Sequence, residues 1–316
     1  MYCYAEADMT KNYPDQLSFI EWFQLLEQLK DCGVKKVIFT GGEIGLNHDS
    51  LKYIDYAYQL GLSVGLITNG TLIGKKRNAQ FLADRCESMT ISLDSIDKEE
   101  NDKNRGRGCY EIAMRGIRNL LDIGFHNIYV NATVTNYNLK SVDQTIEFFK
   151  ENGIAYKLGG FSELGRGSMA DISLSFEERK EIECKEKSAQ RSAFLKPFTI
   201  KESCGLGLGE FVINPVGDIF ACKLLETDDY KLGNIRKNKL ADIYNHKEIE
   251  LLESQNIHHL SGCQTCSFRY LCGGGCRAQH YYHTNDIHGV DRSECQLLQE
   301  LIKNQMYRIW KQTEMT

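Results

Sequence analysis

The chain has 316 residues, of which 42% are hydrophobic and 26% are charged, so it is long enough for one large domain or two modest ones. A net charge of −5 argues against a protein that binds nucleic acid or an anionic membrane, because such proteins usually present a basic surface. No apolar run approaches the ~20 residues of a membrane-spanning helix, and no signal peptide is recognisable. We therefore expect a cytoplasmic protein whose twelve cysteines bind metal or do redox chemistry rather than form disulfides.

Helical and strand-like patterns alternate from residue 17 to about residue 160. Apolar residues recur at helical spacing over 18–33, 50–61, 75–87, 109–124 and 139–152. Between these segments lie short apolar runs that predict strands over 35–40, 63–68, 89–94, 128–135 and 154–158. Alternation of this kind is typical of a parallel sheet whose strands are connected by helices. The sequence therefore predicts an α/β domain.

The composition changes beyond residue 160. Residues 161–203 form a polar connector with a predicted helix near 175–188, and cysteine and glycine become frequent from residue 204. The segment 211–222 predicts a hairpin around Gly217. We therefore divide the chain into an α/β domain, a connector, a cysteine-rich domain and a C-terminal helix or tail, over residues 1–160, 161–203, 204–300 and 301–316.

Four cysteines in the second half are closely spaced, in the pattern C-x2-C-x5-C-x3-C over residues 263–276. Structural zinc prefers two C-x2-C pairs separated by a dozen or so residues. The tighter spacing here, and the glycines at 273–275 that allow close approach of the backbone, favour an iron–sulfur cluster over zinc.

Three polar motifs follow successive predicted strands of the first half. They are Thr40-Gly41-Gly42-Glu43, Thr68-Asn69-Gly70 and Ser92-Leu93-Asp94. Each alone is typical of a turn. Because ligands of parallel sheets bind at the carboxyl ends of strands, the three together predict one shared pocket, in which Glu43 could take a cationic amine.

These motifs resemble those of radical SAM enzymes that carry a C-terminal SPASM domain. The family's GGE motif, which contacts the amino group of S-adenosylmethionine, matches Gly41-Gly42-Glu43, although Ile44 replaces the usual proline. The resemblance implies a partial (β/α)6 TIM-like barrel lacking its first strand, followed by a small cysteine-rich SPASM domain. It also implies that S-adenosylmethionine binds near Tyr4, Gly41, Gly42, Glu43, Asn69, Ser92, Asp94 and Arg105, the last within a D-x-x-R-G run that begins at Asp102.

The segment Cys3-Tyr4 resembles the third cysteine and the following aromatic residue of the family's C-x3-C-x2-C motif. The other two cysteines would precede Met1. The resemblance therefore implies a catalytic [4Fe-4S] cluster with an incomplete ligand set, and we expect a misplaced start or a truncation. The chain as given is then expected to be inactive.

Seven cysteines match the SPASM pattern, which also contains Gly217-x4-Cys222. By this resemblance a first auxiliary [4Fe-4S] cluster is held by Cys204, Cys222 and Cys276, with its fourth ligand unassigned. A second auxiliary [4Fe-4S] cluster is held by Cys263, Cys266, Cys272 and Cys295.

The activity implied is generation of a 5′-deoxyadenosyl radical that modifies a ribosomal peptide or small protein, with flavodoxin or ferredoxin as electron donor. Sulfatase-maturing members have an aspartate where this chain has Lys223, which argues against that activity. Two alternatives stay open. One is an inactive remnant that only binds auxiliary clusters or a peptide, and the other is an enzyme that acts on a small molecule or tetrapyrrole.

Overall fold

The structure is a computed structural model that describes residues 15–160, 172–189, 198–243 and 246–314. It divides into two compact units, Met1–Leu174 and Ser175–Thr316. The division falls inside the predicted connector 161–203. The connector's helix lies in the second unit as α7 (Phe176–Ala189), where it packs on α11 (Arg292–Glu314).

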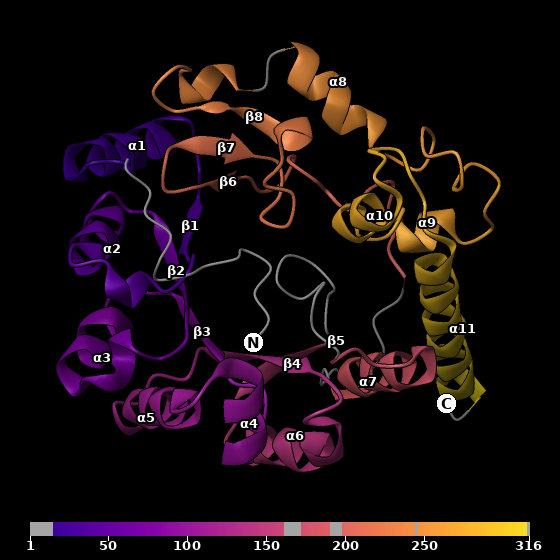
Figure 1. Cartoon of the computed structure of the whole chain (residues 1–316), viewed down its shortest axis with the longest axis horizontal. Helices are drawn as coiled ribbons and strands as arrows, with labels where there is room; N and C mark the ends of the chain where they lie inside the picture. Colours follow the sequence, from indigo (N-terminus) through magenta and orange to yellow (C-terminus); the bar gives the residue numbers. More distant parts are fainter. Residues whose placement is uncertain (1–14, 161–171, 190–197, 244–245, 315–316) are drawn as a thin grey trace. The chain divides into compact units, whose positions relative to one another are not determined.

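The described part of the first unit is a parallel sheet with helices along it (Figure 1). Each strand pairs with the next one in the chain, which gives the order β1-β2-β3-β4-β5. The strands are β1 (Lys36–Phe39), β2 (Ser63–Thr68), β3 (Ser88–Ser92), β4 (Ile128–Val134) and β5 (Ala155–Gly160). The helices are α1 (Phe19–Asp31), α2 (Ser50–Gln59), α3 (Lys76–Ala83), α4 (Lys98–Arg105), α5 (Cys109–Asp122) and α6 (Val142–Glu151). The predicted α/β architecture is confirmed.

The local sequence explains where these helices begin. Ser18 and Glu21 form a capping box at the start of α1, in which each side chain bonds the backbone N–H of the other residue. The sequence pattern did not predict α4, because its eight residues are all polar. Its start is fixed instead by Asp97, whose carboxylate accepts from the N–H of Glu100 at 3.0 Å.

The core of the first unit lies between sheet and helices. Residues of β3 and β4 alternate between buried and more exposed positions, which is the period of a strand with one covered face. Met89 and Ile91 of β3 and Val130 of β4 are fully buried, whereas Tyr129 is 44% exposed. In β3 and β4 one face of the sheet is therefore buried in the core, and the other face is less buried.

The second unit contains a small antiparallel sheet and several short helices. The sheet has β6 (Val212–Ile213), β7 (Asp218–Phe220) and β8 (Lys231–Asn234), and the first two strands form the hairpin predicted around Gly217. Besides α7 and α11, the helices are α8 (His246–Ser254), α9 (Arg269–Cys272) and α10 (Arg277–Thr284). Helix α11 begins before residue 301, so the expected C-terminal helix starts within the segment assigned to the cysteine-rich domain. None of the helices in the described ranges has the length and apolarity needed to cross a bilayer.

Candidate functional site

The carboxylate of Glu43 joins the ends of two neighbouring strands. Its Oε1 accepts from the hydroxyl of Thr68 at 2.7 Å and from the N–H of Gly45 at 3.0 Å. Its Oε2 accepts from the N–H of Asn69 at 2.7 Å. Because two carboxylate oxygens offer about four acceptor positions, these bonds leave room for one further donor. Glu43 therefore connects the loop after β1 to the loop after β2, a role that its motif alone did not indicate.

Asp94, after the end of β3, is buried and paired with a cation. Its Oδ1 accepts from Arg105 Nη2 of α4 at 2.7 Å and from the N–H of Thr133 in β4 at 2.9 Å. The Asp94 side chain is 0% exposed and that of Arg105 is 20% exposed. A buried charge needs such a partner, because an isolated carboxylate would be strongly destabilised away from water. The structure thus brings two of the predicted residues together.

Asparagine side chains support this edge of the sheet and were missed by the sequence analysis. Asn138 Nδ2 donates to the carbonyl of Asp94 at 2.8 Å and to that of Thr133 at 3.0 Å. Asn101 Oδ1 accepts from the N–H of Asp94 at 2.9 Å. The position of Asn138, just beyond β4, is the signal that could have identified it, since it corresponds to the motifs after β1, β2 and β3.

The remaining predicted binding residues lie at the ends of β1, β2 and β3 or outside the described residues. Asn69 uses its Oδ1 to accept from the N–H of Thr71 at 2.9 Å, so this side chain holds its own turn. Gly41 and Gly42 are exposed at the same edge, and Ser92 ends β3. Cys3 and Tyr4 lie outside the described residues.

Three of the predicted metal-ligating cysteines are electrostatic neighbours. Burial raises the pKa of the Cys222 thiol, the N–H of Leu224 opposes that shift, and the thiols of Cys276 and Cys204 add to it. The Leu224 N–H donates to Cys222 Sγ at 3.4 Å. Cys204, Cys222 and Cys276 are hereafter the three-thiol group.

The other four cysteines form a second set of neighbours, hereafter the four-thiol group. Burial raises the pKa of the Cys295 thiol to about 11, and the thiols of Cys263, Cys272 and Cys266 contribute in the same direction. Two N–H donors point at Cys266 Sγ, from the backbone of Phe268 at 3.4 Å and from the Gln299 side chain at 3.8 Å. N–H donors to cysteine sulfurs of this kind help to set the reduction potential of iron–sulfur clusters.

The donor sets of both groups suit iron–sulfur clusters. All cysteines in the described ranges are free, so no disulfide competes for these thiols. Burial raises the pKa of the Cys222, Cys263 and Cys295 thiols, so these three ionise readily only when a metal supplies compensating positive charge. Within the described residues, no three or more His, Cys, Asp or Glu side chains are placed to surround one metal ion together. The match to a cluster therefore rests on thiol chemistry and on how the thiols are grouped.

A run of three glycines separates Cys272 of one group from Cys276 of the other. Gly273, Gly274 and Gly275 all have positive φ, from +68° to +82°. A Cβ on Gly275 would meet His280 Nε2 at 2.8 Å. His280 is buried and accepts at Nδ1 from the N–H of Asp291 at 3.0 Å, and burial lowers its pKa. A neutral His280 therefore packs against the glycine turn at Gly275.

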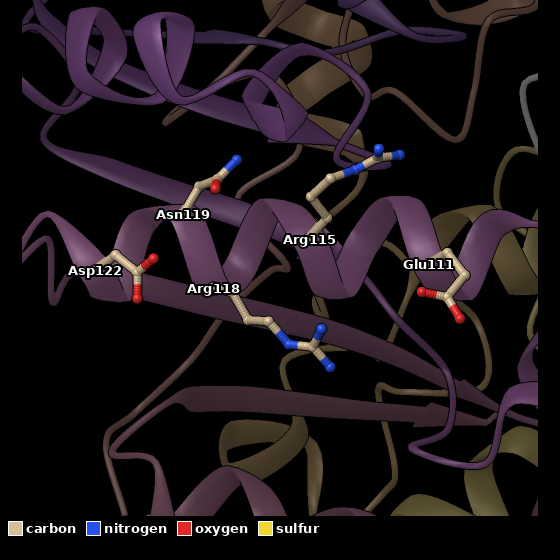
Figure 2. Close-up of a pocket in the computed structure, with 5 residues that line it drawn as sticks. All are labelled: Glu111, Arg115, Arg118, Asn119 and Asp122. Carbon is tan, nitrogen blue, oxygen red and sulfur yellow. The ribbon is translucent and has the colours of Figure 1, made fainter.

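A separate hollow of about 340 Å³ lies on α5 and is lined by Glu111, Arg115, Arg118, Asn119 and Asp122 (Figure 2). Asn119 is its buried member and donates to the carbonyl of Ile73 at 2.9 Å, while the others are exposed. The charges are of both signs, and no predicted site residue lines it. We assign no role to it in the candidate site.

Two family models match the chain. Residues 1–149 match the radical SAM superfamily, and residues 204–267 match an iron–sulfur cluster-binding domain, SPASM. Mycofactocin maturase MftC of Mycolicibacterium smegmatis is 26% identical over 303 residues, which cover 90% of this chain and 76% of that protein. AdoMet-dependent heme synthase of Nitratidesulfovibrio vulgaris is 27% identical over 318 residues, with coverages of 90% and 85%. A solved structure of anSMEcpe with bound AdoMet and Kp18Cys peptide aligns with a TM-score of 0.72 at 16% identity, covering 95% of this chain and 91% of that one. This likeness confirms the fold expected from the sequence.

Proposed function

Because the chain belongs to the radical SAM superfamily and carries a SPASM iron–sulfur domain, we propose that it uses S-adenosylmethionine to modify a ribosomally made peptide or small protein by radical chemistry. The observation that carries the proposal is the presence, in one chain, of the polar carboxyl edge of a parallel sheet and of two all-thiol groups. When bound, a [4Fe-4S] cluster with S-adenosylmethionine would supply the radical chemistry, and Cys3, its predicted ligand in this chain, lies outside the described residues. Flavodoxin or ferredoxin is the proposed electron donor.

The chain's own residues position the sulfonium cofactor at the carboxyl edge. Glu43 has one acceptor position left after its three internal bonds, and this position suits the amino group of S-adenosylmethionine. The exposed backbone of Gly41 and Gly42 allows close approach there. We place the ribose near Ser92 and the Asp94–Arg105 pair, whose burial holds the loop after β3 in one arrangement.

The three-thiol and four-thiol groups would hold two auxiliary [4Fe-4S] clusters. Thiolates are the ligands that such clusters use. The three-thiol group offers one ligand fewer, so the fourth iron would be open to an exchangeable ligand, to the substrate or to a protein ligand other than cysteine. The protein would contribute burial and N–H donors around the sulfurs, which set how easily each cluster takes up an electron.

A peptide substrate is supported by the maturase name of MftC and by the peptide bound in the anSMEcpe structure. The similarity to heme synthases favours a second candidate, modification of a tetrapyrrole. The third candidate is a protein that binds clusters or a peptide without radical chemistry.

An anaerobic assay separates the three candidates. The protein is expressed, reconstituted with iron and sulfide, reduced, and incubated with S-adenosylmethionine. Peptides encoded beside its gene are tested in one arm and tetrapyrroles in another, while 5′-deoxyadenosine and substrate mass are followed. We expect 5′-deoxyadenosine together with a mass change in a peptide. A mass change only in a tetrapyrrole supports the second candidate, and absence of 5′-deoxyadenosine from iron-loaded protein supports the third.

A further inference from the structure

Arg277 is one of the most deeply buried side chains of the second unit. It is the first residue of α10, directly after Cys276, and is 1% exposed. Its Nη2 donates to the carbonyls of Ile287 at 2.7 Å and Gly289 at 3.0 Å, and its Nε donates to Gln255 Oε1 at 3.2 Å. Its Nη1 is buried and has no hydrogen-bond partner among the described residues.

This guanidinium has only neutral partners in the described part of the chain. Arg85, Arg105 and Arg179 each form an ion pair with a carboxylate. Arg277 instead meets two carbonyls and the amide of Gln255, which is itself fully buried. A charge at such depth is strongly destabilised unless a counter-charge lies nearby. The fold therefore calls for a negative group that no described side chain supplies by direct contact with the guanidinium.

The four-thiol group lies within electrostatic reach of Arg277. The loop that receives the guanidinium, 287–289, is followed by Val290, and Val290 packs on Gly262 and on the buried cluster that contains Cys263. Burial raises the pKa of the Cys263 thiol, as do the neighbouring thiols of Cys272 and Cys266, and the positive charge of Arg277 opposes this rise. A short run of contacts, from the guanidinium through Gly289 and Val290 to the core around Cys263, therefore links the cation to the four-thiol group.

We infer that the counter-charge of Arg277 is the anionic iron–sulfur cluster held by the four-thiol group, and that the buried guanidinium raises the reduction potential of this cluster. The inference rests on the auxiliary clusters proposed above. Four thiolates give a cluster of this type a net negative charge, and reduction adds one more electron. A fixed cation in a low-dielectric interior favours the reduced state, because the attraction grows with each negative charge. In this role Arg277 acts through the electric field of its guanidinium on the cluster, without contact with the substrate.

The sharpest test replaces the neutral partner of Arg277 by an acid of the same shape. In Gln255→Glu the new carboxylate takes the place of Gln255 Oε1, 3.2 Å from Nε, and pairs with the guanidinium inside the protein. We expect the midpoint potential of the four-thiol cluster to become more negative, with the ratio of reduced to oxidised cluster at the wild-type midpoint falling at least tenfold, about 59 mV for one electron. The readout is a redox titration followed by electron paramagnetic resonance.

Matched variants separate this role from a structural one. Gln264→Glu adds the same charge beside Cys263 at an exposed position, where water screens it, so the expected shift is much smaller. Arg277→Met should lower the midpoint potential of the four-thiol cluster as Gln255→Glu does. Arg277→Lys keeps the positive charge and should leave that potential close to the wild-type value. The two cluster signals are assigned beforehand with a Cys222→Ala variant, which lacks a ligand of the three-thiol group.

The outcomes distinguish this inference from the proposed function. If wild-type protein takes up no iron–sulfur cluster at the second unit, the proposed clusters are wrong. If the wild type is loaded but Gln255→Glu leaves the potential unchanged and only raises the melting temperature, Arg277 acts through packing alone and the inference fails. An equal shift in Gln264→Glu would also overturn it, since any added charge would then suffice.

Discussion

Replacing Glu43 by alanine should affect both the stability of the first unit and its affinity for S-adenosylmethionine. The substitution removes the acceptor of three hydrogen bonds, at 2.7 Å, 2.7 Å and 3.0 Å, and leaves the Thr68 hydroxyl and two N–H groups to find water. A hydrogen bond to a charged group contributes about 1.5–3 kcal/mol. Because Glu43 is only half-buried and the three bonds are not additive, we expect a total of about 2–4 kcal/mol in unfolding free energy.

This loss corresponds to a fall of about 4–16 °C in the melting temperature of a unit of this size. Thr68→Val is the matched control, because it removes one of the three donors and keeps the carboxylate. It should cost at least about 1.5–3 kcal/mol, the range for one hydrogen bond to a charged group, because the Thr68 hydroxyl also accepts from the N–H of Gly70 at 3.0 Å. Thermal unfolding followed by circular dichroism measures both variants.

Affinity is measured separately, on variant protein that is still folded at the assay temperature. Loss of one charged hydrogen bond to the amino group should weaken binding of S-adenosylmethionine about ten- to a hundred-fold, as measured by isothermal titration. A variant as stable as wild type would refute the role of Glu43 in joining β1 and β2. A destabilised but folded variant with undiminished affinity would refute its role as a ligand.

Further predictions concern both units. Gly70→Ala should destabilise the first unit by about 1–3 kcal/mol, because φ at this residue is +101° and a Cβ would lie 2.9 Å from the backbone of Ala113. Gly124→Ala, which has open space around its Cβ, should cost only about 1–2 kcal/mol. Urea unfolding measures both variants. Asp102 receives the N–H groups of Gly108 and Tyr110 at 2.8 Å and 2.9 Å. Burial acts to raise its pKa but is outweighed by these bonds, so the pKa is lowered; Asp102→Ala should therefore cost about 1 kcal/mol at pH 7. That difference should shrink as the pH falls below about 4, the unfolded-state value, and equal costs at pH 7 and pH 3 would contradict it. Adding a thiol-containing peptide to iron-loaded protein should change the resonance of the three-thiol cluster and leave that of the four-thiol cluster alone; no response in either would argue against an open iron.

The strands could be predicted because their apolar runs are continuous and are bounded by turn residues. The run predicted over 63–68 coincides with β2, and the helix predicted over 109–124 ends two residues earlier in the structure. Helix α4 could not be predicted from periodicity, since a helix without an apolar face gives no such signal and depends on its cap at Asp97.

The residue types of the site could be predicted from the sequence, but the hydrogen bonds among them could be predicted only in part. The polar residues after successive strands were identifiable because parallel strands bring their carboxyl ends to one edge. The internal bonds of Glu43 and the bridging role of Asn138 depend on which strands are neighbours and on their register, which no local pattern contains. Likewise the sequence showed Arg277 only as a basic residue after a cysteine, and its burial among neutral partners emerged from the tertiary structure.

The glycine run at 273–275 has a consequence for how iron would be acquired. Cys272 before it belongs to the four-thiol group and Cys276 after it belongs to the three-thiol group, so the chain passes from one group to the other within three residues. Iron bound at either group would fix one end of this segment and remove much of the conformational freedom that the second group must otherwise lose on binding. Loading of the two clusters should therefore be cooperative, with half-loaded molecules scarce at intermediate iron concentrations.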